Sequence, residues 1–188
     1  MELRDAIASR RSVRTYAARA VERPTIERLI RTAVLAPSAT NAQPWAFGVL
    51  EGVDRLRDLS ARAKAHLLER LAEFPHRQRY RERLSDPAFN IFYDAPALVI
   101  VYARPSTPYA VGDCSMAAYT LMLTAHDSGL ATCWIGFAEP LLQTPEAKKE
   151  LGVSSDLHVV APLTLGYPAS APSPTPRNPP EILFWTRG

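Results

Sequence analysis

A continuous apolar segment, ALVIVYA at residues 97–103, indicates how the rest of the chain must be arranged. Strands with one solvent-exposed face alternate apolar and polar residues, whereas an unbroken apolar run is typical of a central strand covered on both faces. Further apolar runs predict inner strands at residues 130–137 (LATCWIGF) and 157–168 (LHVVAPLTLGYP), and AFGVLEG at residues 46–52 predicts a strand and a turn. We therefore expect a small sheet covered on both faces.

The covering layers are predicted by apolar residues that recur every three to four positions. These residues predict helices at 3–9, 24–36, 53–74 and 111–130, and one or two short helices within 139–151. The second helix begins near Pro24, which suits a first turn, and stops before Pro37. This order of helices and few strands predicts an α+β or α/β fold.

Composition excludes several classes of protein. The 188 residues are expected to form one domain, and the net charge of +3 comes from interspersed basic and acidic residues, which disfavours a nucleic-acid partner. The N-terminal MELRD does not resemble a signal peptide, and the longest apolar run is far shorter than the ~18 residues that span a bilayer. We expect a soluble, cytoplasmic protein with no membrane partner, in which Cys114 and Cys133 are buried free thiols.

Common catalytic motifs are missing from the sequence. It contains no GxGxxG, GxxxxGK[ST], HExxH or GxSxG pattern, and its four histidines are scattered. No metal ligand set is expected. If the chain is an enzyme, a cofactor should supply the reactivity.

The segment SRRSVRTY, residues 9–16, is unusually rich in arginine. If it leaves the first helix and becomes extended, Arg10, Ser12 and Arg14 point to one side and Arg11 to the other. Two guanidinium groups and a hydroxyl on one side can bind phosphate. The alternative is that these arginines pair with acids or favourably end a helix.

The C-terminal segment is the other unusual feature. Residues 169–180 are dense in proline and should be extended, and EILFW at residues 181–185 follows them. An apolar stretch after a stiff spacer indicates contact with a second subunit.

Four segments taken in order, RRSVRTY, APSATNAQPW, TCWIG and GYPASAPSPTPR, resemble signatures of the nitroreductase family. The resemblance covers about residues 2–185. It implies a homodimeric FMN-dependent flavoprotein with an α+β fold. In that fold a central mixed, mainly antiparallel sheet is surrounded by helices, and the C-terminal extension (169–188) is exchanged across the dimer. It also implies that residues 53–90 form an insert that shapes substrate access.

The resemblance further implies which residues bind FMN. Its phosphate and ribityl chain are expected to contact Arg10, Ser12, Arg14 and, as a neighbour, Arg11, with Arg177 returning to the same phosphate. The partner subunit is expected to lay a loop along the ring through Pro37, Ser38, Ala39, Asn41 and Gln43. The ring's N5 and O4 edge is expected to face Trp134, Ile135 and Gly136.

The implied activity is hydride transfer from NADH or NADPH through flavin N5 to an electron-poor small-molecule acceptor (a nitroaromatic, quinone or enone) with ping-pong kinetics. No side chain is then needed as an obligate acid or base. Alternatives are a relative that fragments flavin or removes a halogen reductively, and a flavin-binding protein without turnover. A nucleic-acid binder would instead use Arg77, Arg79, Arg81 and Arg83.

Overall fold

A computed structural model describes residues 2–187 and contains a four-stranded sheet. Its strands are β1 (Trp45–Glu51), β2 (Ala97–Ala103), β3 (Ala131–Trp134) and β4 (His158–Gly166), in the order β1-β2-β4-β3. Every neighbouring pair of strands is antiparallel, and a parallel bridge joins Ser12 to Thr132 at the β3 edge. The expectation of a mainly antiparallel sheet within an α+β fold is therefore confirmed.

Strand β2 is buried along its whole length, as its apolar sequence predicts. Val99 and Val101 belong to the hydrophobic cluster on one face of the sheet, and Leu98 and Ile100 belong to the cluster on the other face. Because side chains alternate along a strand, a sheet covered on both sides needs apolar residues at every position of its central strand.

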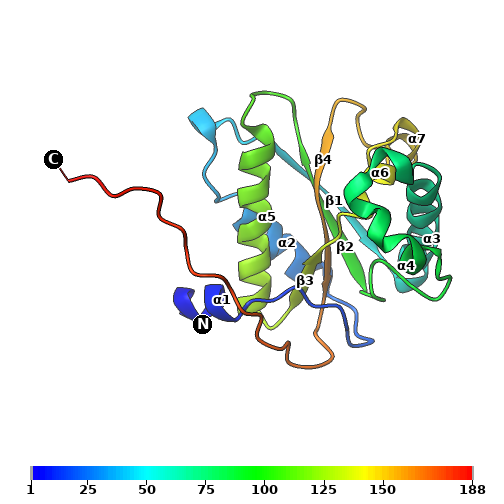
Figure 1. Ribbon diagram of the computed structural model, residues 1–188, viewed down its shortest axis with the longest axis horizontal. Helices are drawn as coiled ribbons and strands as arrows, with labels where there is room; N and C mark the ends of the chain where they lie inside the picture. Colours follow the sequence, from blue (N-terminus) through cyan, green and yellow to red (C-terminus); the bar gives the residue numbers. More distant parts are fainter. Residues whose placement is uncertain (1, 188) are drawn as a thin grey trace.

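Helices form the two covering layers (Figure 1). One face carries α2 (Arg23–Ala33) and α5 (Ala110–Asp127), with α1 (Leu3–Ser9) at the end of α5. The other face carries α3, α4, α6 and α7, at Val53–Glu69, Arg81–Ser85, Glu139–Leu142 and Pro145–Glu150. Three 3₁₀ turns complete the chain, namely η1 (Ala39–Asn41), η2 (Leu71–Glu73) and η3 (Pro75–Tyr80). Of the described residues, no helix has the length and apolar character needed to cross a membrane.

Two predicted elements are shorter in the structure. The helix predicted over residues 53–74 ends at Glu69, because Arg70 leaves helical geometry (φ −107°, ψ 17°) and a 3₁₀ turn then buries Leu71. The strand predicted over residues 130–137 pairs only from Ala131 to Trp134. The residues after it are apolar because they pack as a turn against the α3 face of the sheet.

The arginine-rich segment leaves helix α1 and runs extended beside β3, which is the first of the two arrangements considered from the sequence. Arg10 already has extended geometry (φ −55°, ψ 133°), and the Val13 N–H donates to the carbonyl oxygen of Thr132 at 3.1 Å. Val13 is buried, and the Tyr16 hydroxyl lies 2.7 Å from Thr164 Oγ1. Burial raises the pKa of Tyr16 above its ordinary value, so the phenol stays protonated.

The close packing of Tyr16 against the end of β4 leaves no room for a side chain at Gly166. A Cβ added there would lie 2.6 Å from Pro96 Cδ and 2.8 Å from Tyr16 Cδ1. We expect Gly166→Ala to lower the free energy of unfolding by about 1–3 kcal/mol through overpacking, measured by urea unfolding followed by circular dichroism. Gly112→Ala in α5 is the matched control, because its Cβ would meet nothing within 4 Å. Equal losses in the two variants would contradict the packing argument.

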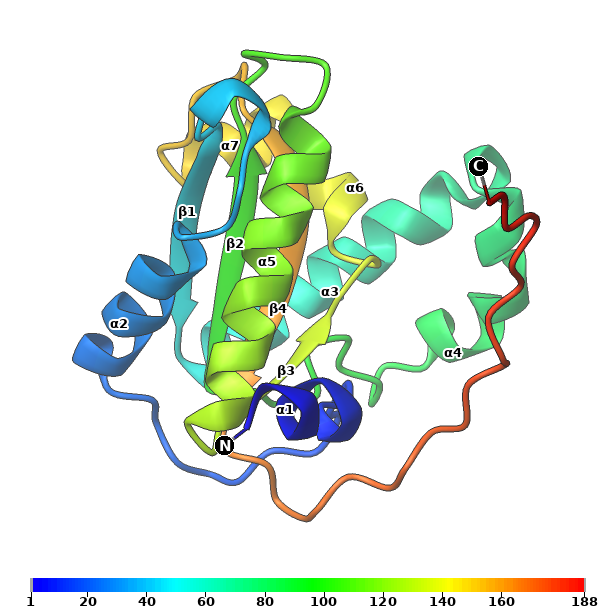
Figure 2. The ribbon, with the colours of Figure 1, turned by 90° about the vertical axis from the view of Figure 1, so that its left-hand side faces the viewer.

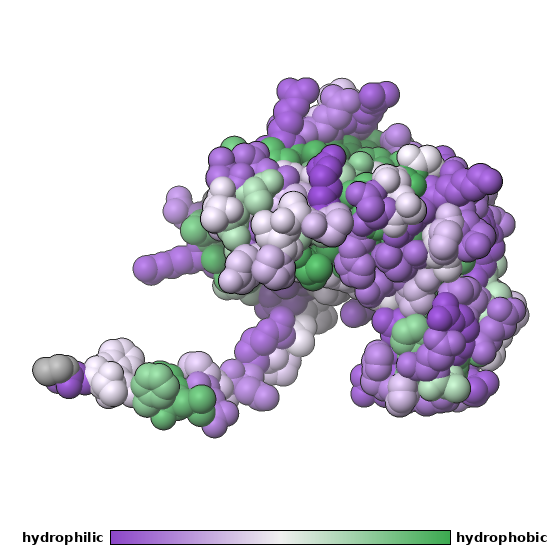
Figure 3. All heavy atoms as spheres, turned by 90° about the horizontal axis from the view of Figure 1, so that it is seen from above, coloured by the Kyte–Doolittle hydropathy of each residue, from purple (hydrophilic) through white to green (hydrophobic). Residues whose placement is uncertain are grey.

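The C-terminal segment is extended and lies away from the body of the chain (Figures 1 and 3). Residues 169–187 are all exposed, which agrees with the prediction of an extended tail. Four consecutive apolar side chains near its end are 63–82% exposed: Ile182, Leu183, Phe184 and Trp185. Exposed apolar residues gathered in one stretch mark an interaction segment rather than a solvated surface.

Candidate active site

Three neighbouring cavities follow the arginine-rich segment. The first, about 250 Å³, is lined by Arg10 and Arg11 together with residues of α5 and β3. The second, about 290 Å³, lies between residues 11–15 and the start of the C-terminal tail. The third, about 450 Å³, is lined by Arg14 and the end of β3. Because Arg11 lines the first and second cavities and Arg14 the second and third, one extended segment connects them.

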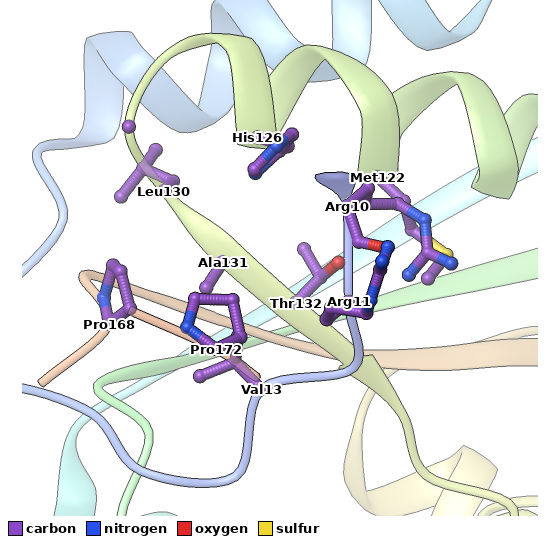
Figure 4. Close-up of a pocket in the computed structure, with 11 residues that line it drawn as sticks. Arg10, Arg11, Val13, Met122, His126, Leu130, Ala131, Thr132, Pro168 and Pro172 are labelled. Carbon is purple, nitrogen blue, oxygen red and sulfur yellow. The ribbon is translucent and has the colours of Figure 1, made fainter. Parts of the chain in front are cut away.

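Buried donors without acceptors gather in the first cavity (Figure 4). Within residues 2–187, no hydrogen-bond partner meets Arg10 Nε, Arg10 Nη1, Arg11 Nε or Thr132 Oγ1, although all four atoms are buried. Buried polar groups are normally satisfied, because each unpaired one costs about 1–3 kcal/mol. Two guanidinium groups and a hydroxyl that are buried without partners can bind an oxyanion such as phosphate.

No Asp or Glu is among the described residues that line the first cavity. Arg11 Nη1 donates to the carbonyl oxygens of Ala8 and Arg10 at 2.7 and 2.8 Å, so it closes the end of α1. The Arg10 guanidinium lies 5.9 Å from the centre of the Tyr119 ring. Burial, and then the positive charge of Arg10, lower the pKa of His126 in the cavity wall, which favours its neutral form at neutral pH.

The expected alternation along residues 10–14 is only partly present. Ser12 and Arg14 line the second cavity together, whereas Arg10 lies in the first, and Arg11 borders both. The difference arises because Arg11 turns back to the last carbonyls of α1 instead of pointing away from Arg10. The side chains of Ser12 and Arg14 also reach Cys133, whose pKa burial raises, so this thiol is not a nucleophile at neutral pH.

At the end of β3, a backbone N–H group rather than a side chain is available to bind a ligand. The Ile135 N–H donates to Pro162 O at 2.8 Å, but the N–H of Gly136 has no acceptor in the described chain. A Cβ added at Gly136 would meet nothing within 4 Å, so this chain does not fill the space beside that amide. Trp134 is partly exposed and Ile135 is buried. A ligand in the third cavity can therefore approach a free backbone donor closely.

The loop that contains Pro37, Ser38, Ala39, Asn41 and Gln43 lies at the opposite end of α5 from Arg10 (Figure 2). The Gln43 N–H donates to Ser38 Oγ at 3.0 Å, Gln43 Nε2 donates to Asn41 Oδ1 at 3.0 Å, and the Ala39 N–H donates to Asp113 Oδ2 at 3.2 Å. Asn41 and Gln43 have positive φ, and both are exposed. One chain does not bring this loop to the cavities.

Arg177 is likewise separate from the other arginines in a single chain. It is exposed, and its Nη1 donates only to the carbonyl oxygens of Thr175 and Pro176 among the described residues. However, tail residues 170–173 and Thr175 line the second cavity beside Ser12 and Arg14. The tail thus begins at the site before it turns outward.

Several residues of the site were not predicted from the sequence. Thr132 and His126 line the first cavity, and Arg77 and Phe137 line the third. Thr132 lies within a predicted strand and His126 within a predicted helix, so no local sequence pattern marked either of them as a site residue. Both free thiols are buried, as expected, and no group of residues suited to a metal ion is present in the described part of the chain.

Comparison with known proteins gives the class, a nitroreductase-type flavin oxidoreductase. The sequence model of the Nitroreductase family matches residues 7–167, and the chain belongs to this family. It is therefore an NAD(P)H nitroreductase-type oxidoreductase, and solved structures with the same fold contain bound FMN.

Individual relatives agree with this assignment. An Archaeoglobus fulgidus protein named as an NADH dehydrogenase/NAD(P)H nitroreductase is 31% identical, over 86% of this chain and 83% of its own. The 4-nitrobenzoate reductase of Pseudomonas putida is 30% identical, over 86% and 83%. A nitroreductase structure from Bacteroides fragilis with bound FMN superposes with a TM-score of 0.83 at 26% identity and covers all of both chains.

Proposed function

We propose that this protein is an FMN-dependent oxidoreductase that transfers reducing equivalents from NADH or NADPH to an electron-poor small molecule such as a nitroaromatic, a quinone or an enone. The observation that carries the proposal is the group of buried, unpartnered donors on Arg10, Arg11 and Thr132. A phosphate carries close to two negative charges at neutral pH and would satisfy them.

The residues that line the three cavities offer partners for the phosphate, the ribityl chain and the polar edge of the FMN ring. Arg10, Arg11, Ser12 and Arg14 would hold the phosphate and ribityl chain, and the free N–H of Gly136 would face the polar edge of the ring. FMN held by these residues would supply the hydride chemistry between the nicotinamide donor and the acceptor, with ping-pong kinetics. With a nitro acceptor, one NAD(P)H and one proton convert the nitro group to nitroso and water. The chain's own part is to bind, orient and supply a backbone donor beside the negative charge that develops on the ring.

The same proposal explains why the loop at residues 37–43 and Arg177 do not reach the cavities of their own chain. In a homodimer the loop at residues 37–43 would come from the partner subunit, and the C-terminal tail would cross to it. Helices α1 and α5 carry exposed apolar side chains that support this arrangement. They are Leu3, Ile7, Val111, Met116 and Tyr119. These side chains and the apolar end of the tail offer two separate apolar surfaces to a second copy.

Anaerobic reduction of the FMN-loaded protein tests the function. We expect a yellow protein whose absorbance near 450 nm bleaches with NADH or NADPH and returns when an electron-poor acceptor is added. Colour that neither nucleotide bleaches would refute the reductase and leave a flavin-binding protein. A colourless protein that takes up no FMN would refute the cofactor assignment itself.

The space beside Gly136 gives a specific prediction. We expect Gly136→Ala to weaken FMN binding about tenfold, because its methyl group would project into the cavity that the ring needs, while the apo-protein stays as stable as the wild type. Fluorescence titration with FMN and urea unfolding of the apo-protein measure the two effects. Unchanged FMN affinity would remove Gly136 from the site. A large loss of apo-protein stability would show that the glycine has a structural role.

A further inference from the structure

The third cavity carries more positive charge than a flavin ring requires. Besides Arg14, it is lined by four basic residues of η3 and α4: His76, Arg77, Arg79 and Arg83. No Asp or Glu lines it in the described chain, and its remaining lining residues are largely aromatic or aliphatic. A ligand that enters this cavity therefore meets aromatic rings and guanidinium groups together.

Arg77 is the cation best placed to bind such a ligand. Its side chain is only 14% exposed, Nη1 is buried without a hydrogen-bond partner in the described residues, and Nη2 lies 3.9 Å from Glu139 Oε2. By contrast, the nearby Arg62 forms a bidentate pair with Glu150 at 2.5 and 2.9 Å. The Arg77 guanidinium thus has a buried donor available for a planar anion, and the geometry of a carboxylate matches that of a guanidinium group.

Three arginines of this segment stack on aromatic rings, and Arg77 also lies near Glu139. The guanidinium groups of Arg77, Arg79 and Arg83 lie 4.9, 4.8 and 4.3 Å from the ring centres of Phe74, Tyr80 and Phe89, respectively. Within residues 2–187, neither Arg79 nor Arg83 forms an ion pair. Stacking on a ring fixes a guanidinium without neutralising it.

The position of this cavity relates the cations to the reaction. Its floor runs from Cys133 to Phe137, the segment that the proposed function places along the flavin ring. The Tyr80 and Phe137 rings meet edge to face at 5.2 Å and form an aromatic wall. The flavin ring and the acceptor would share the volume of about 450 Å³, so the acceptor is a single substituted ring rather than a larger molecule.

We propose that Arg77, with Arg79 and Arg83 beside it, binds the carboxylate of an aromatic acceptor, so that the enzyme prefers anionic aromatic substrates over neutral ones of the same shape. This inference rests on the proposed function, because it needs the flavin ring at the floor of the cavity. It assigns the segment 75–85, which has no role in binding FMN, to substrate selection.

A binding experiment tests this without turnover. Benzoate is titrated into the oxidised, FMN-loaded protein and followed by the flavin difference spectrum, with benzyl alcohol as the neutral probe. We expect benzoate to bind at least tenfold more tightly, and Arg77→Met to weaken benzoate about 10- to 100-fold. Arg81→Met is the matched control, because Arg81 is exposed in the same segment and does not line the cavity. Equal affinity for the two probes, or no effect of Arg77→Met, would overturn the proposal.

Half-reactions separate the acceptor from the other anionic ligand, NAD(P)H. We expect Arg77→Met to reduce the preference for 4-nitrobenzoate over nitrobenzene, measured as the ratio of their re-oxidation rates, about tenfold or more. If bleaching by NAD(P)H slows instead and that ratio stays, the cations serve the donor and the proposal is wrong. If Arg77→Met does not fold, Arg77→Lys, which keeps the charge but not the fork, should show a smaller loss in both measurements.

The two proposals fail in different ways. A wild-type flavin that NAD(P)H does not bleach refutes the proposed function, whereas benzoate can still bind the oxidised protein. A flavin that bleaches normally but does not distinguish benzoate from benzyl alcohol refutes only the role of Arg77.

Discussion

Replacement of Arg10 and Arg177 together by alanine is expected to weaken FMN binding by about 10²- to 10⁴-fold. Each arginine would contribute charge-assisted hydrogen bonds worth about 1.5–3 kcal/mol, and about 1.4 kcal/mol corresponds to a factor of ten. The structure supports the larger share for Arg10, because its Nε and Nη1 are buried and unpartnered. Arg177 is exposed in one chain and would contribute only once the tail is ordered by a partner.

Riboflavin provides the control for this prediction, because it lacks the phosphate. The wild type should bind FMN far more tightly than riboflavin, and the double variant should lose most of that difference. Fluorescence titration of each apo-protein with both ligands measures it. If the double variant keeps the preference for FMN, the phosphate is held elsewhere. Arg19→Ala is a matched substitution, since Arg19 stacks on Tyr167 at 3.9 Å and lines none of the three cavities.

The sheet could be predicted from the sequence because a strand that is buried on both faces is apolar at every position. The run at 97–103 has apolar side chains facing both clusters, and this pattern needs no knowledge of the neighbours. Element ends were harder to predict. Residues 135–137 continue the apolar pattern of β3, yet they pack as a turn, and hydropathy does not distinguish a buried turn from a strand.

The candidate site could be predicted where a short segment contains its chemistry. The extended course of residues 10–16 and the free donors of Arg10 follow from an arginine-rich stretch next to a helix end. Thr132 could not be found in this way, because it meets Arg10 only through pairing between segments about 120 residues apart. The placement of Arg11 depended on the last carbonyls of α1, a tertiary detail that strand alternation does not include.

The segment at residues 75–85 shows a different limit of sequence reasoning. Its arginines at 77, 79, 81 and 83 suggest a solvated or nucleic-acid-binding face when they are considered alone. In the structure, three of them line a cavity with aromatic residues, and Arg81 does not. The distinction depends on 3₁₀ geometry in residues 75–80, which no propensity argument supplied.

Removal of the apolar end of the tail is expected to have the largest effect on assembly. A chain that ends at Pro180 lacks Ile182, Leu183, Phe184 and Trp185, all of which are exposed in one subunit. Burial of such side chains contributes about 1.5–3 kcal/mol each, and ordering of the tail offsets part of that gain. We expect the dimer dissociation constant to rise at least about 10³-fold, measured by sedimentation equilibrium.

A chain that ends at Trp185 is the matched control, because it loses the last residues but keeps the apolar stretch. It should remain dimeric, and both proteins should keep the far-ultraviolet circular dichroism of the wild type, since the tail does not pack on its own subunit. FMN affinity should fall with the dimer in the shorter chain only, because the loop at 37–43 would reach the ring from the partner subunit. In its own chain this loop lies at the opposite end of α5 from α1 (Figure 2). If the chain ending at Pro180 still sediments as a dimer and binds FMN normally, the tail does not join the subunits. The exposed apolar residues of α1 and α5 would then have to hold the two subunits together.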